Sequence, residues 1–77
     1  MSEQARILQA IAENLGLSVG DIDRHALLQE DLNLGPVEFS DLLGYLSAEF
    51  QVHFTPEDVS NLETVDDLVI LVEDNLI

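Results

Sequence analysis

The side chains of this sequence that could do chemistry are two histidines, several serines and many carboxylates. Neither His25 nor His53 has a cysteine or a second histidine at ligand spacing, so we expect no metal site and two solvated loop residues. No base stands at a recognisable spacing from the serines at Ser18, Ser40, Ser47 and Ser60. Nucleophilic catalysis, which needs such a base, is therefore not indicated.

The carboxylates also lack the pattern of a reactive site. No Asp-x-Asp-x-Asp-Gly calcium loop occurs, and the adjacent pair Asp66 and Asp67 is typical of acids that favour the first turn of a helix. Nothing marks a pocket that would raise a carboxyl pKa for acid–base work. We predict that the protein is not an enzyme.

Composition narrows the class of partner. The 77 residues are enough for one domain, which we place over residues 1–77, and 47% of them are hydrophobic, enough to fold. Sixteen acidic residues against two arginines give a net charge of −14. Such a chain repels nucleic acid and acidic membranes, so a basic protein surface is the expected partner.

The expected setting is cytoplasmic. The chain has no cysteine, its first residues lack the basic flank and apolar run of a signal peptide, and no apolar run reaches the ~20 residues of a membrane span. The charge favours a monomer, although the small outer face of the second predicted helix, described below, leaves room for a dimer.

A first helix is predicted over residues 2–15, with Gly16 as its left-handed cap. Its apolar stripe comprises Ala5, Leu8, Ile11, Ala12 and Leu15. The long connection up to Gly35 must be held down by apolar side chains, for which the candidates are Leu17, Val19, Ile22, Leu27 and Leu28.

A second helix is predicted to begin at Pro36, since proline suits the first helical position, and to end at Phe50. At about 100° per residue its core face comprises Phe39, Leu42, Leu43, Leu46 and Phe50. The opposite face comprises Val37, Asp41, Gly44 and Ala48. So small and weakly charged a face is either a loosely selected surface or a docking face.

Two further helix starts are marked by caps. Thr55 and Pro56 begin a short helix that ends near Asn61, and Thr64 begins another that runs to Asn75. The core stripe of the last helix comprises Val65, Leu68, Leu71 and Val72. No strand pattern occurs, so the prediction is an all-α fold: a small four-helix bundle with three main helices, a short third one and a long first loop.

In their order along the chain these pieces resemble an acyl carrier protein. The matching pieces are Leu15-Gly16, Glu30-Asp31-Leu32, Glu49-Phe50, Pro56 and Thr64-Val65. The resemblance implies a four-helix carrier fold. It also implies that the second helix docks onto basic patches of synthases, transferases and the enzyme that attaches phosphopantetheine.

The resemblance fails at one place. The family has an Asp-Ser-Leu signature at the head of the second helix, and its serine carries 4'-phosphopantetheine. The same positions here read Gly35-Pro36-Val37, so no cofactor is expected. The docking residues that we predict are Val37, Glu38, Asp41, Gly44, Ala48 and Glu57, although Gly44, Ser47 and Ala48 replace the bulky and acidic residues that the family has there.

Three functional interpretations remain open. The first is a serine-less carrier homologue that acts by protein–protein contact, as an accessory or regulatory partner in fatty-acid or polyketide-type biosynthesis. The second is a carrier modified at another serine, for which Ser40 is the nearby candidate. The third is a protein that holds an acyl chain between its helices without a covalent bond.

Overall fold

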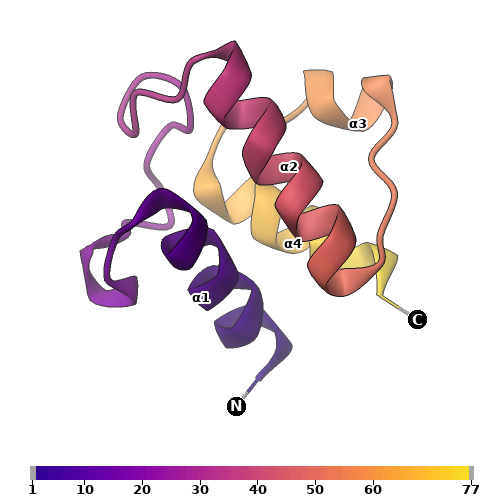
Figure 1. Cartoon of the computed structure of the whole chain (residues 1–77), viewed down its shortest axis with the longest axis horizontal. Helices are drawn as coiled ribbons and strands as arrows, with labels where there is room; N and C mark the ends of the chain where they lie inside the picture. The colour runs from indigo at the N-terminus through magenta and orange to yellow at the C-terminus, as the bar shows by residue number, and fades with distance from the viewer. Residues whose placement is uncertain (1, 77) are drawn as a thin grey trace.

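The computed structural model describes residues 2–76 and contains four α-helices (Figure 1). They are α1 (Glu3–Leu15), α2 (Pro36–Phe50), α3 (Pro56–Ser60) and α4 (Val65–Asn75), with a short 3-10 helix, η1, at Val19–Asp21. No strand occurs within residues 2–76, although Leu27 and Thr64 form one isolated antiparallel bridge. The predicted all-α, four-helix fold is confirmed, and η1 is an addition to it.

The helix ends follow from local capping. The Ser2 hydroxyl accepts from the Ala5 amide at 3.1 Å and begins α1. Gly16 ends α1 in the left-handed region, at φ 72° and ψ 28°, where glycine has no Cβ penalty. Thr55 and Thr64 each accept from an amide three residues on, and the carboxylates of Asp58 and Asp67 return the bond.

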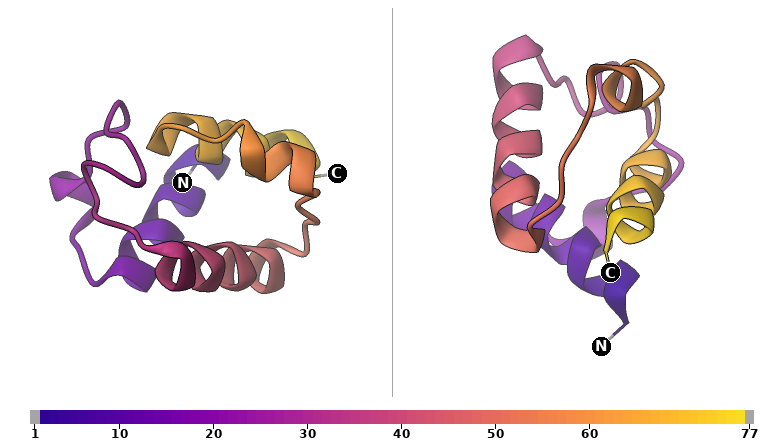
Figure 2. Two further views of the ribbon diagram at one scale, coloured as in Figure 1. Left: turned by 90° about the horizontal axis from the view of Figure 1, so that it is seen from above. Right: turned by 90° about the vertical axis from the view of Figure 1, so that its right-hand side faces the viewer.

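The core lies between three helices. Helix α1 packs against both α2 and α4, which lie on opposite sides of the molecule, while α3 sits along one edge (Figures 1 and 2). Fully and nearly fully buried apolar residues from all three helices and the loops fill the centre: Ile7, Ala10, Ile11, Ala12, Ile22, Leu28, Leu34, Leu42, Leu46, Val52, Val65, Leu68, Val69 and Val72.

The predicted stripe of α1 was partly wrong. Ile7 is completely buried and Ala10 is buried, whereas the predicted Ala5, Leu8 and Leu15 are only half-buried. The reason is that α1 has neighbours on two sides, so its buried arc is wider than that of a helix lying on a single surface. Val69 of α4, also missed, is buried for a similar reason at the edge of its stripe.

The apolar residues that hold down the long loop differ in part from the predicted ones: Leu34 is also buried, Ala26 and Leu32 pack against the core, and Leu27 is half-buried. Ile22 and Leu28 are buried, as expected, but Leu17 and Val19 are 42% and 41% exposed. Backbone bonds to the end of the chain supply the rest. The Leu28 amide donates to the Glu63 carbonyl, and the amides of Val65 and Asp66 donate to the carbonyls of Ala26 and Arg24, at 2.9–3.0 Å.

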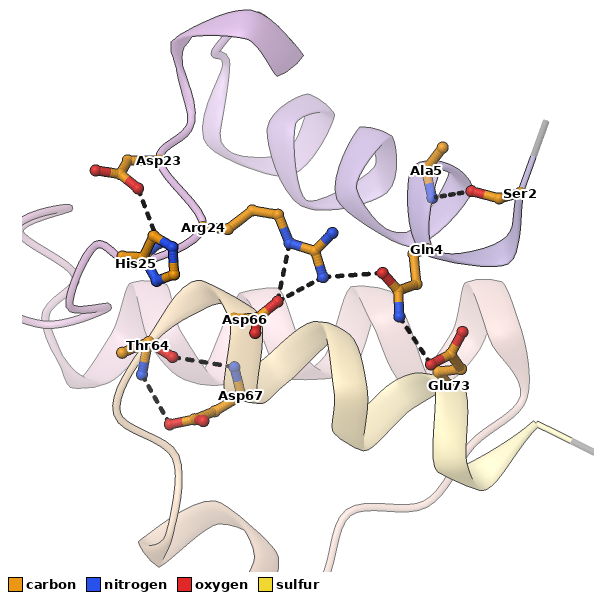
Figure 3. Close-up of polar contacts among 10 residues, drawn as sticks. All are labelled: Ser2, Gln4, Ala5, Asp23, Arg24, His25, Thr64, Asp66, Asp67 and Glu73. Atoms are coloured by element: carbon orange, nitrogen blue, oxygen red, sulfur yellow. Dashed lines mark hydrogen bonds and ion pairs between the residues drawn. The ribbon is translucent and has the colours of Figure 1, made fainter.

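A polar cluster joins this loop to α1 and α4 (Figure 3). Arg24 Nε donates to Asp66 Oδ1 at 2.9 Å, and its Nη2 donates to the same oxygen and to Gln4 Oε1. Gln4 in turn donates to Glu73 at 3.0 Å. Asp66 lies in the first turn of α4, as predicted, and it also binds the guanidinium of Arg24, 42 positions away.

Candidate functional site

The start of α2 is built without a reactive group. Gly35 is the N-cap in extended conformation and Pro36 is the first helical residue. Because glycine has no side chain to cap the helix, Glu38 does the capping from the other direction: its Oε1 accepts from the Gly35 amide at 3.2 Å. Proline brings neither a hydroxyl nor an N–H to this position. The site therefore offers helix geometry and no nucleophile.

The outer face of α2 is open, and we call Val37, Asp41, Gly44 and Ala48 the α2 face. Val37 is 68% exposed and the other three residues are exposed. A Cβ added at Gly44 would meet nothing within 4 Å among residues 2–76. On the opposite side, Leu42 and Leu46 are fully buried. The structure thus presents the face that the helical arithmetic selected.

Two predicted docking acids lie apart from that face. Glu38 is exposed, but one of its oxygens is held by the Gly35 amide, a role that the sequence analysis missed. A glutamate three residues after a helix N-cap is the signal that could have shown it. Glu57 is exposed in the first turn of α3, a different element, and so belongs to a separate patch.

The serines near α2 differ in availability. Ser47 is half-buried and donates to the Val52 carbonyl at 2.6 Å, and Ser60 donates to the Glu57 carbonyl at 2.9 Å. Ser40 is exposed on α2, one turn after Pro36. Of these three hydroxyls, Ser40 is thus the one that faces solvent without a bond to residues 2–76.

A cavity of about 550 Å³ opens beside Pro36. It lies between the end of the loop, α2 and α3, and its lining is largely apolar: Gln29, Leu34, Pro36, Phe39, Val59, Ser60 and Leu62. The residues come from segments far apart in the chain, so no short motif could have revealed it. Five of its seven lining residues are apolar, so an aliphatic chain is one ligand that it could receive.

The remaining titratable groups form no catalytic arrangement. His25 and His53 are exposed, and within residues 2–76 no three metal-ligating side chains gather at one place. Partial burial, with the carboxylates of Glu49 and Glu13, raises the pKa of the Tyr45 phenol above its ordinary value. The Tyr45 hydroxyl donates to Glu13 Oε2 at 3.4 Å. No helix of the described chain is long and apolar enough to cross a membrane.

Fold and site together define a small acidic helical domain with an open second helix. Comparison with known proteins gives its family: the model described as "Phosphopantetheine attachment site" matches residues 5–72. The chain belongs to this family, whose relatives found by sequence are acyl carrier proteins.

The relatives align over most of their length. The acyl carrier protein of Buchnera aphidicola subsp. Baizongia pistaciae is 32% identical over 65 residues, 84% of this chain and 83% of the relative. The acyl carrier protein of an Exiguobacterium strain is 30% identical over 70 residues, which are 91% of this chain and 89% of the relative. The crystal structure of the acyl carrier protein of Thermotoga maritima has the same fold, with a TM-score of 0.74 at 22% identity over 95% of this chain and 89% of that one.

Proposed function

We propose that this protein is an acyl-carrier-like protein without the attachment serine, with Pro36 in its place. It acts by docking onto a biosynthetic enzyme, as an accessory or regulatory partner in acyl, fatty-acid or polyketide-type biosynthesis. The observation that carries the proposal is the proline at the first position of α2. Attachment of phosphopantetheine needs a hydroxyl nucleophile, and a proline ring has none.

The proposed docking surface is the α2 face with Glu38 beside it, and Glu57 on α3 is a separate docking residue. A net charge of −14 directs it toward a basic enzyme surface and speeds the encounter by electrostatic steering. The exposed Val37 supplies apolar area, and the absent side chain of Gly44 lets a partner backbone approach closely. We expect it to act in the cytoplasm as a monomer.

The test is intact mass after incubation with coenzyme A and a promiscuous phosphopantetheinyl transferase. The expected result is an unchanged mass, because positions 35–37 offer no hydroxyl or thiol. A gain of one phosphopantetheine would contradict the proposal. Peptide mapping would then show whether the arm sits on Ser40, the exposed serine one turn further along α2.

Two variants control for a failed reaction. Pro36→Ser alone restores the hydroxyl but leaves Gly35 in place of the signature acid, so we expect slow or no modification. Gly35→Asp, Pro36→Ser and Val37→Leu together restore the signature, and modification is expected. The triple change fits the fold: a Cβ at Gly35 meets only the flexible end of Glu38, at 2.7 Å, and an aspartate at this N-cap position can accept from the Glu38 amide.

A second candidate function is non-covalent binding of an acyl chain, which the 550 Å³ cavity beside Pro36 favours. Titration of a medium-chain fatty acid into labelled protein, followed by NMR, separates it from the first. Shifts confined to Phe39, Val59 and Leu62, which line the cavity, would support it; an unchanged spectrum would exclude it.

A further inference from the structure

A second groove lies between α3 and α4, and no residue of α2 lines it. Its volume is about 230 Å³, and it is lined by Asp58, Asn61, Leu62, Asp67, Ile70, Leu71 and Asp74. Its apolar part is contiguous, comprising the half-buried Leu62 and Leu71 and the 41% exposed Ile70. Several exposed apolar side chains in one groove indicate an interaction site, whereas a single exposed leucine does not.

The rim of this groove is acidic and fixed in place. Asp58 and Asp67 each use Oδ2 to cap a helix, at 3.1–3.2 Å, which holds the two carboxylates still. Asp74 is exposed on the same face of α4, two turns after Asp67. At a rise of about 1.5 Å per residue, roughly 10 Å separates the two acids along the helix, with Ile70 and Leu71 between them.

The charge around the α3–α4 groove indicates which kind of partner fits it. No basic residue lines the groove, and both arginines are engaged elsewhere: Arg24 with Asp66 and Arg6 over the Phe50 ring. A second copy of this chain would bring another −14 charges and no basic helix, so self-association through this face is disfavoured. The groove instead complements a helix with basic residues seven apart and an apolar residue between them.

We propose that the α3–α4 groove is a second docking surface, which binds a basic amphipathic helix of a partner protein. Lysine or arginine at positions i and i+7 of that helix lies over Asp67 and Asp74, and a leucine-sized side chain at i+3 or i+4 enters the groove beside Ile70. The two surfaces lie on different elements, so the protein can hold two partners at once and act as an adaptor.

The test uses a designed peptide and the whole chain. The peptide is a helix of about 18 residues, five turns, with lysines at i and i+7 and leucines at i+3 and i+4; a scrambled peptide of equal composition is the control. NMR shift mapping on labelled protein is expected to show changes at Asn61, Ile70 and Asp74. Equal binding of the scrambled peptide, shifts spread over every acidic face, or no binding would overturn the proposal.

A pair of matched substitutions tests whether residues of the groove supply the free energy of peptide binding. Ile70→Asp is expected to lower the affinity for the peptide by about tenfold or more, as removal of an interface anchor does. Val19→Asp makes the same kind of change on η1 at an equal exposed fraction of 41%, and is expected to leave the affinity within about twofold, as a position outside the contact does.

Charge reversal gives a second readout that leaves the core alone. Asp74→Lys, on the exposed surface of α4, is expected to lower the affinity for the peptide more than Asp21→Lys on η1 does. Equal losses in both pairs would mean that only the net charge matters, and would overturn the proposal. None of these changes touches the α2 face, so this proposal and the proposed function fail independently.

Discussion

At the scale of single residues, the first turn of α2 has the backbone geometry of a helix start but no reactive side chain at positions 35–37. Pro36 satisfies the geometry of a first helical residue, and Glu38 accepts from the Gly35 amide, which is the half of a capping box that does not need an N-cap side chain. The helix therefore forms as well with proline as with a hydroxyl residue. Positions 35–37 thus offer no hydroxyl, and the α2 face beyond them is exposed.

Gly44 offers a residue-scale prediction about that face. Gly44→Leu should raise the free energy of unfolding by up to about 1 kcal/mol, because glycine is that much poorer than leucine within a helix. The new side chain points into open space, so nothing opposes the gain. Urea denaturation measures it. A loss of several kcal/mol would show that position 44 is packed inside.

The same variant also tests docking. Added to the triple variant that restores the attachment signature, Gly44→Leu should slow modification by the transferase, because its bulk blocks close approach to the α2 face. Gly20→Leu, at an equally open glycine on η1, is the matched control and should leave the rate unchanged.

At the scale of elements, the long loop is joined to the rest of the molecule both by the burial of Ile22, Leu28 and Leu34 and by polar contacts. Backbone bonds link Arg24, Ala26 and Leu28 to residues 63–66, and the Arg24 guanidinium ties the start of α4 to Gln4 on α1. By contrast, none of the five residues of α3 is buried. Helix α3 consequently lies between open grooves on both sides.

Arg24→Met should lower the free energy of unfolding by about 1 kcal/mol. The variant keeps the apolar stem but loses the bonds to Asp66 and Gln4; the pair is 38% and 35% exposed, so solvent screening limits its worth. Arg6→Met is the control, because it removes the same charge and only a cation–π contact worth about 0.5 kcal/mol. Urea midpoints that fall equally would show that net charge alone decides stability.

At the scale of the whole molecule, self-repulsion among the sixteen acids opposes folding, because unfolding moves them apart. The molecule measures 30 × 29 × 19 Å. At 0.01 M salt the screening length is ~30 Å, so charges interact across the whole molecule. At 0.1 M salt it is ~10 Å, and each charge interacts mostly with its near neighbours.

The melting temperature should therefore rise between 0.01 and 0.1 M NaCl, by on the order of 5 °C, which corresponds to about 1 kcal/mol in a domain of this size. Calorimetry or circular dichroism measures it. MgCl₂ should act more strongly per mole, because a divalent ion screens more effectively. A melting temperature that is flat over this range would mean that the folded structure already accommodates the acids.

The sequence by itself determined the helices, because their ends depend on neighbours within a few residues. Ser2, Gly16, Pro36, Thr55 and Thr64 mark their boundaries by capping or by fixed backbone angles, and the structure places the helices at those positions. The exposed face of α2 followed from the same local arithmetic, since a helix turns by a constant angle.

Only the tertiary structure decided which side chains meet across the chain. The wide buried arc around Ile7, the exposure of Leu17 and the pairing of Arg24 with Asp66 depend on how α1, the loop and α4 pack. So do the cavity beside Pro36 and the groove beside Ile70, whose walls come from separate elements. Helical periodicity states which way a residue faces; what it faces is set by contacts between residues distant in sequence.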